Sequence, residues 1–242
     1  MRDLAAMREL AAMRELAAMR SASTPDARFR AIERLALEWH GRPPRGYPRS
    51  EISASAESLG VTLPPTVRRW YESLALTEGV AFGQNHVVAP DRWVLDGRRL
   101  TFAVENQANW RLLVGLEGDD PAVVSVGSRP GSLSLAFSLH ALQTALFESV
   151  MGAARGICNG EAAPGAEAWL LELFGDPVAE PWGDAGPGPV SFYAGAPGLA
   201  FHQSAGDIEW IYFALVDDHA VRAKVSEEAP IRHWALTPDE GA

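Results

Sequence analysis

Carboxylates in the middle of the chain are the residues best suited to acid–base chemistry. Glu105 belongs to the polar triplet Glu105-Asn106-Gln107, and Asp119 and Asp120 follow it along the chain. Two such carboxylates could hydrolyse a glycosidic bond, with one as general acid and the other as base or nucleophile. The triplet could instead tie a strand to a helix, because its amide and carboxylate groups combine donors with acceptors. We favour the structural interpretation, and an enzyme that uses Glu105 remains the weaker hypothesis.

The other residue types that commonly do chemistry show no site pattern. The histidines include no His-Glu-x-x-His pair and no Cys/His cluster with metal-ligand spacing. Cys158 lies in a glycine-rich segment without an identifiable histidine partner, and the glycines of 183–198 follow no strand-to-helix phosphate pattern. The sequence therefore predicts a protein that is not an enzyme and that holds no metal and no cofactor. The histidines are His40, His86, His140, His202, His219 and His233.

Alternating apolar residues on both sides of the triplet predict the strands that position it. They cover 100–104 and 110–114, and a Val-rich strand over 122–126 follows an acidic turn. Glu, Asn and Gln are costly inside a sheet unless their donors and acceptors are matched. We therefore expect the triplet to lie within a sheet with its polar groups matched, and Trp110 to pack on the sheet face.

Periodicity assigns most of the remaining chain to helices and strands. Helical spacing predicts helices over 27–40, 50–59, 65–75, 133–154 and 166–174. Strand patterns cover 191–193, 199–203, 208–216 and 219–225, with Asp217-Asp218 as a hairpin turn between the last two. Loops are expected over 156–164 and 176–189, and a loose tail is expected after Trp234.

The first twenty residues form a six-residue repeat built on Leu-Ala-Ala-Met-Arg-Glu. These residue types favour a helix, but Leu and Met recur every three residues and therefore spiral around it by about 60° per step. Such a helix has no fixed apolar face to bury. We interpret 1–20 as an extension separate from the fold, with a partner-binding helix as the alternative, and 21–242 as a single domain.

Acidic residues are concentrated at the C-terminal end of the chain. Residues 160–242 contain three Lys or Arg against 14 Asp or Glu, a net charge of −11, whereas the whole chain carries −10. Such a surface repels nucleic acid and attracts basic proteins, although simple solubility would explain it equally well. The single cysteine excludes an internal disulfide, and no apolar run resembles a signal peptide or a membrane span. These features predict a cytoplasmic protein.

The order of several motifs resembles the SUKH superfamily. The shared features are the start of an aromatic helix, a strand that ends in the polar triplet, and a proline turn before a Val-rich strand. The residues that match are Leu63, Pro64, Trp70, Glu105, Asn106, Gln107, Trp110 and Pro121. The resemblance implies an α+β fold, with a mixed, largely antiparallel sheet flanked by helices. It also implies either a bacterial immunity protein that neutralises a toxin, commonly a nuclease or deaminase, or a scaffold protein.

The resemblance and the charge together suggest an immunity-type binding protein. We expect it to bind a basic toxin domain through protein–protein contacts, without direct binding of nucleic acid or membrane. The residues expected to bind the partner are Asp207, Glu209, Trp210, Asp217 and Asp218. The alternative is a scaffold or adaptor domain in a larger bacterial assembly, with the N-terminal repeat as its tether.

Overall fold

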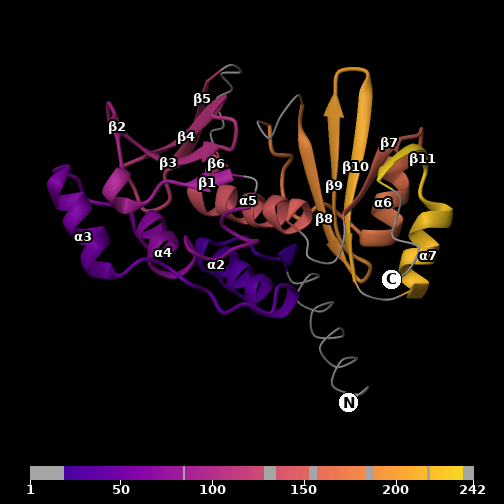
Figure 1. Ribbon diagram of the computed structural model, residues 1–242, viewed down its shortest axis with the longest axis horizontal. Helices are drawn as coiled ribbons and strands as arrows, with labels where there is room; N and C mark the ends of the chain where they lie inside the picture. Colours follow the sequence, from indigo (N-terminus) through magenta and orange to yellow (C-terminus); the bar gives the residue numbers. More distant parts are fainter. Residues whose placement is uncertain are drawn as a thin grey trace, which may run out of the picture.

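Two antiparallel sheets lie on opposite sides of a central helix in the computed structural model, which describes residues 19–83, 85–127, 135–152, 157–183, 188–216 and 219–236 (Figure 1). This arrangement confirms the predicted α+β class. The strands divide between two sheets instead of forming one. The central helix, α5 (Phe137–Met151), explains why, because 11 of its 15 residues are buried and it must be covered on more than one side.

The first sheet follows the strand order β1-β3-β4-β5-β6, and β2 also pairs with β3. Its hairpins β3–β4 and β4–β5 confirm the strands predicted around the triplet. Strand β6 takes the first two described residues of the segment predicted as helix, so α5 begins only at Phe137. The strands are β1 (Asn85–Val87), β2 (Leu95–Asp96), β3 (Arg99–Glu105), β4 (Trp110–Gly115), β5 (Ala122–Gly127) and β6 (Leu135–Ala136).

The helices that precede this sheet begin and end where local chemistry predicts. The side chain of Thr24 accepts a hydrogen bond from Ala27 N, and Pro25 occupies the first turn of α2. In α4, Val67, Trp70 and Tyr71 are buried together, as their helical spacing predicts. These elements are α2 (Pro25–Arg34), the π-helix η1 (Leu35–Trp39), α3 (Arg49–Ser58) and α4 (Pro65–Ser73); the 3-10 helix η2 (Pro90–Arg92) lies between β1 and β2.

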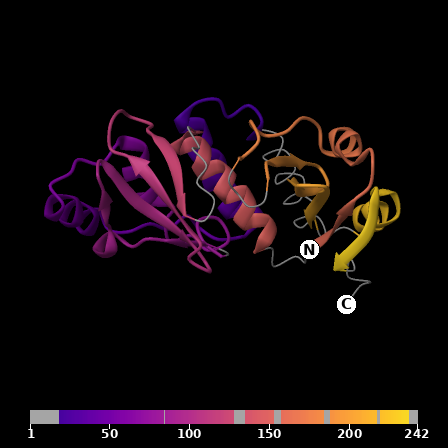
Figure 2. The same ribbon diagram turned by 90° about the horizontal axis from the view of Figure 1, so that it is seen from above.

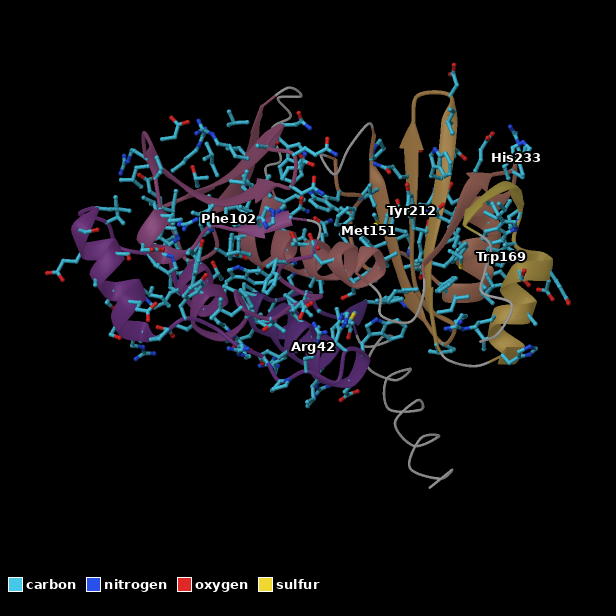
Figure 3. The ribbon with its side chains drawn as sticks, viewed as in Figure 1. Arg42, Phe102, Met151, Trp169, Tyr212 and His233 are labelled. Atoms are coloured by element: carbon cyan, nitrogen blue, oxygen red, sulfur yellow. The ribbon has the colours of Figure 1, made fainter. Side chains whose placement is uncertain are left out.

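The second sheet has the order β11-β7-β10-β9-β8 and presents one face to α5. Helices α6 and α7 lie on its other side (Figure 2). Figure 3 places Tyr212 of β10 near Met151 at the end of α5, and both pack against the main core. The elements are β7 (Ile157–Ala162), α6 (Ala166–Phe174), β8 (Val190–Gly195), β9 (Gly198–Ala205), β10 (Ile208–Leu215), α7 (His219–Glu228) and β11 (Ile231–Leu236).

The predicted loop over 156–164 is wrong, because β7 lies inside the second sheet. Its glycine permits close packing: a Cβ on Gly160 would lie 2.7 Å from His233 O in β11. A glycine needed for this approach looks the same in sequence as one that ends a strand. The loose tail predicted after Trp234 is also wrong where the structure describes it, since β11 continues to Leu236.

The predicted strand over 219–225 is wrong as well, because these residues belong to helix α7. Val221 and Val225 suit either structure, since they alternate with polar residues and also stand four apart on one helix face. The buried Val225 packs in the core between the second sheet and its outer helices. Asp217 and Asp218 lie outside the described residues, and the chain beyond them enters a helix, so no strand-to-strand hairpin follows β10.

The end of the N-terminal repeat packs against the folded chain. Met19 is buried in the main core cluster, and Arg20 Nη2 donates a hydrogen bond to Ala194 O of β8 at 3.2 Å. The guanidinium of Arg20 also lies beside Gly175. These two residues belong to the packed structure, whereas residues 1–18 lie outside the described part.

Candidate functional site

The triplet Glu105-Asn106-Gln107 lies where β3 enters a hairpin turn, so only Glu105, which pairs with Asn85 of β1, belongs to the sheet. Strand β3 ends at Glu105, and Asn106 and Gln107 are exposed in the turn to β4. A Glu105 carboxylate oxygen accepts a hydrogen bond from Asn109 N at 3.1 Å, and Glu105 O accepts one from Ala108 N at 2.8 Å. These two hydrogen bonds of Glu105 lie within the turn and do not tie the strand to a helix. Residues exposed in a turn are solvated, so they need no matched partners inside a sheet.

The other motif residues serve packing. Leu63, Pro64 and Trp70 are buried at the start of α4 and along it, and Pro121 is buried before β5. Trp110 is half-buried against the main core, as the sequence predicts.

The acidic turn before β5 makes the tie that the triplet was expected to make. Asp120 accepts hydrogen bonds from Ser138 N at 2.8 Å and Ser138 Oγ at 2.6 Å, at the start of α5. Arg28 of α2 donates to Ser138 Oγ at 3.0 Å, and Asp119 O accepts from Thr66 of α4. One turn thereby joins three helices. No sequence pattern points to this tie, because Asp120 and Ser138 lie in different elements.

A row of buried polar side chains along α5 was also missed. In the sequence these groups show no common pattern, because those before residue 148 lie within an uncharged run and Glu148 ends that run. They are fully buried at 0% exposure: Ser138, His140, Gln143, Glu148 and Ser149. Buried polar groups require partners, so this row identifies α5 as the polar centre of the fold.

The partners of Glu148 and Ser149 indicate a structural role. A Glu148 carboxylate oxygen accepts from Asn85 N at 3.1 Å and Asn85 Nδ2 at 2.9 Å. Ser149 Oγ lies 2.9 Å from His40 Nε2 and donates to Gly79 O at 3.1 Å. A serine that is fully buried and donates its proton to a backbone carbonyl is poorly placed as a nucleophile. The Ser149–His40 pair fastens the end of η1 to α5.

A cavity of about 20 Å³ lies beside the first half of α5. Its wall is mainly apolar and comes from both halves of the molecule, with Trp70 from α4, Phe102 from β3 and Trp182 from the segment before β8. Figure 3 shows Phe102 on the first sheet next to α5, where its ring centroid is 5.6 Å from that of His140. Burial lowers the pKa of His140 to about 3, so its imidazole is neutral at physiological pH.

The acidic residues expected to bind a partner meet in part at one hairpin. Asp207 lies in the β9–β10 turn and Glu209 is the second residue of β10; both are exposed, while Trp210 is half-buried. Ile208 between them is a large apolar side chain that is 45% exposed. One Glu209 oxygen lies 3.5 Å from His202 Nε2. We call residues 207–210 the acidic hairpin tip; Ile208 was not predicted as part of it.

Comparisons of the chain with family models, with curated proteins and with solved structures found no match. The SUKH resemblance therefore stays a prediction. In the described residues, no group of three or more His, Cys, Asp or Glu side chains is arranged to hold a metal ion. Within the same residues, no helix is both long enough and apolar enough to cross a membrane.

Proposed function

We propose that this chain is an immunity-type binding protein that neutralises a basic toxin domain by binding it through the acidic hairpin tip. The observation that carries the proposal is the combination of exposed Asp207 and Glu209 with exposed Ile208 and half-buried Trp210. Apolar and aromatic anchors within a charged rim are the usual composition of a binding hot spot.

The apolar and the acidic side chains of the acidic hairpin tip lie on different faces of β10. Side chains alternate between the faces of a strand, so Ile208 and Trp210 share one face while Glu209 points to the other with His202. The partner would therefore receive an apolar contact on one side of the tip and a carboxylate on the other. The net charge of −11 over 160–242 would speed association with a basic surface.

The direct test is co-expression of the chain with toxin domains encoded beside its gene, followed by measurement of binding. Protection and a stable complex are expected. The double substitution Asp207→Lys with Glu209→Lys should slow association at low salt by about tenfold or more, and Ile208→Asp should accelerate dissociation. Absence of both rescue and complex for every neighbouring toxin would refute the proposal.

A matched control is available at the far end of the molecule. Glu57 is an exposed carboxylate on α3, which lies at the opposite end from β10 in Figure 1. Glu57→Lys changes the net charge by half as much as the double substitution and leaves the tip intact. Equal slowing per unit of charge by Glu57→Lys would show that general charge, and not the hairpin tip, attracts the partner.

The second candidate function, a scaffold or adaptor domain, is supported by one contact at the end of the N-terminal repeat. Arg20, the last residue of the repeat, is fixed to β8 of the second sheet through Ala194 O. Deletion of residues 1–18, which keeps buried Met19, separates the two functions. Toxin protection should survive this deletion, whereas attachment to an assembly through the repeat should be lost.

A further inference from the structure

One row of cross-strand neighbours on the second sheet is open to solvent at its outer end. Direct cross-strand neighbours place their side chains on the same face of a sheet. Val190, where the row begins, is buried in the main core, so the row lies on the face that packs against α5. From β8 to β11 its members are Val190, Gln203, Trp210, Glu161 and His233.

Exposure increases along this row, because α5 covers only part of the face. Gln203, Trp210 and Glu161 in its middle are half-buried, and His233 at its outer end is exposed. Figure 1 shows the β9–β10 hairpin rising beyond α5. Tyr212, which lies nearer that helix on the same face as Trp210, packs against the main core instead. The outer half of the face is therefore accessible to a partner.

The side chains in the middle of the row suit a cationic ligand. Trp210 carries an aromatic ring, whose face attracts a cation. Glu161 and Gln203 are its direct neighbours on either side, and such pairs have Cβ atoms about 4.5–5.5 Å apart. Carboxylate and amide oxygens accept hydrogen bonds from a guanidinium, and a guanidinium also stacks on aromatic rings. One arginine side chain can therefore satisfy all three residues.

An arginine of the chain itself already pairs with this row. Arg232 Nη1 lies 3.4 Å from Glu161 Oε1, and the Arg232 side chain is 52% exposed. Exposed ion pairs are weak, so an arginine of a partner can share Glu161 or replace Arg232 there. Asp207 and Glu209 of the neighbouring hairpin tip add further carboxylates. The surface around the row is thus acidic and complements a basic partner.

We propose that Glu161, Gln203 and Trp210 form a binding site for an arginine side chain of the partner protein, and we call these three residues the arginine site. The inference rests on the proposed function and adds an orientation to it. Exposed Ile208 shares a face with Trp210. The basic partner therefore lies on the side of the acidic hairpin tip that faces α5.

The first test needs no toxin. A hexa-arginine peptide is titrated into the full-length protein while NMR follows the indole Nε1–H signals, and Trp210→Phe assigns the signal of interest. The Trp210 signal should shift until it saturates. Trp169 is the internal control, because it is also half-buried but packs in the cluster on the other side of the sheet. A Trp210 signal that shifts no more than that of Trp169 overturns the arginine site.

Two comparisons separate a specific site from general charge attraction. Glu161→Gln keeps the shape of the side chain and should weaken peptide binding by about fivefold. Glu167→Gln removes an exposed carboxylate from α6, on the opposite side of the sheet, and should change binding by less than about twofold. A hexa-lysine peptide should bind more weakly than hexa-arginine, because an ammonium group lacks the planar fork of a guanidinium. Equal effects of the two substitutions, or equal binding of the two peptides, would overturn the arginine site.

The same variants distinguish failure of the arginine site from failure of the proposed function. If a neighbouring toxin forms a complex that Glu161→Gln weakens no more than Glu167→Gln does, the arginine site is refuted and the immunity function stands. If the peptide results are as expected but no toxin binds, the immunity function is refuted and the arginine site is supported. If Glu161→Gln fails to fold, the unmodified protein still decides through the Trp210 signal and the comparison of the two peptides.

Discussion

Substitution of Asp120 by alanine should destabilise the protein more than its position in a surface turn suggests. The carboxylate accepts hydrogen bonds from Ser138 N at 2.8 Å and from Ser138 Oγ at 2.6 Å, and one of its oxygens lies 4.0 Å from Arg28 Nη1. It therefore caps α5 from a distant part of the chain, where a negative charge also favours the helix dipole. Its loss would leave a backbone N–H of the central helix without this partner.

The magnitude follows from these contacts. Loss of a capping hydrogen bond costs about 1 kcal/mol, and a hydrogen bond to a charged group contributes about 1.5–3 kcal/mol. The ion pair with Arg28 adds about 0–1 kcal/mol, because both side chains are only partly buried. Since these contributions overlap at Ser138, we expect Asp120→Ala to lower the free energy of unfolding by about 2–3 kcal/mol. Asp120→Asn should cost about half as much, because its carbonyl can still accept from Ser138 N.

Urea unfolding followed by circular dichroism measures this difference. The midpoint should fall without a change in the denaturant slope, which would show that stability changed and compactness did not. Asp119→Ala is the matched control, because Thr66 bonds to the backbone carbonyl of Asp119 and not to its side chain. Asp119→Ala should stay within about 0.5 kcal/mol of the parent protein. If Asp120→Ala also stays within about 0.5 kcal/mol of the parent protein, the contacts of Asp120 with Ser138 and Arg28 contribute no measurable stability.

Three other outcomes are expected. Gly46→Ala should lower the free energy of unfolding by about 2–3 kcal/mol in urea, because the new Cβ would lie 2.2 Å from Glu72 O. Gly97→Ala is the control: its Cβ meets no atom within 4 Å, so it should cost only the strain of its positive φ. Equal effects of the two substitutions would contradict the predicted clash at Gly46. Burial raises the pKa of Cys158 from 9.0 to about 11, so its thiolate fraction at pH 8 should be about a hundredfold below that of an ordinary thiol. Labelling with a disulfide reagent measures this fraction, and rapid labelling of the native protein would disprove the prediction. Burial lowers the pKa of His140 from 6.5 to about 3, so between these pH values the unfolded chain binds a proton that the native chain does not. The free energy of unfolding should therefore decrease by up to about 1.4 kcal/mol for each pH unit below 6.5. His140→Gln should flatten this pH dependence relative to exposed His86→Gln, and an unchanged slope would refute the assignment.

Local patterns sufficed where one element carries its own information. The helix that starts after Thr24, the aromatic face of α4 and the β3–β4 hairpin were predicted because capping, helical spacing and strand alternation act between near neighbours in the chain. Ambiguous segments were decided by their surroundings. Residues 219–225 fit both a strand and a helix, and the packing of Val225 beside the second sheet selects the helix.

The sequence by itself determined the α+β class, most helices and strands, and the concentration of acid in the C-terminal third, since composition and periodicity are local properties. Only the tertiary structure decided which polar residues are structural. Asn106 and Gln107 of the triplet turned out to be exposed in a hairpin turn, whereas Asp120 and the polar row of α5 hold the core together. Hydrogen-bond partners such as Asp120 with Ser138, or Asn85 with Glu148, are set by the packing of distant segments. Burial makes those bonds necessary, and burial exists only once the chain has folded.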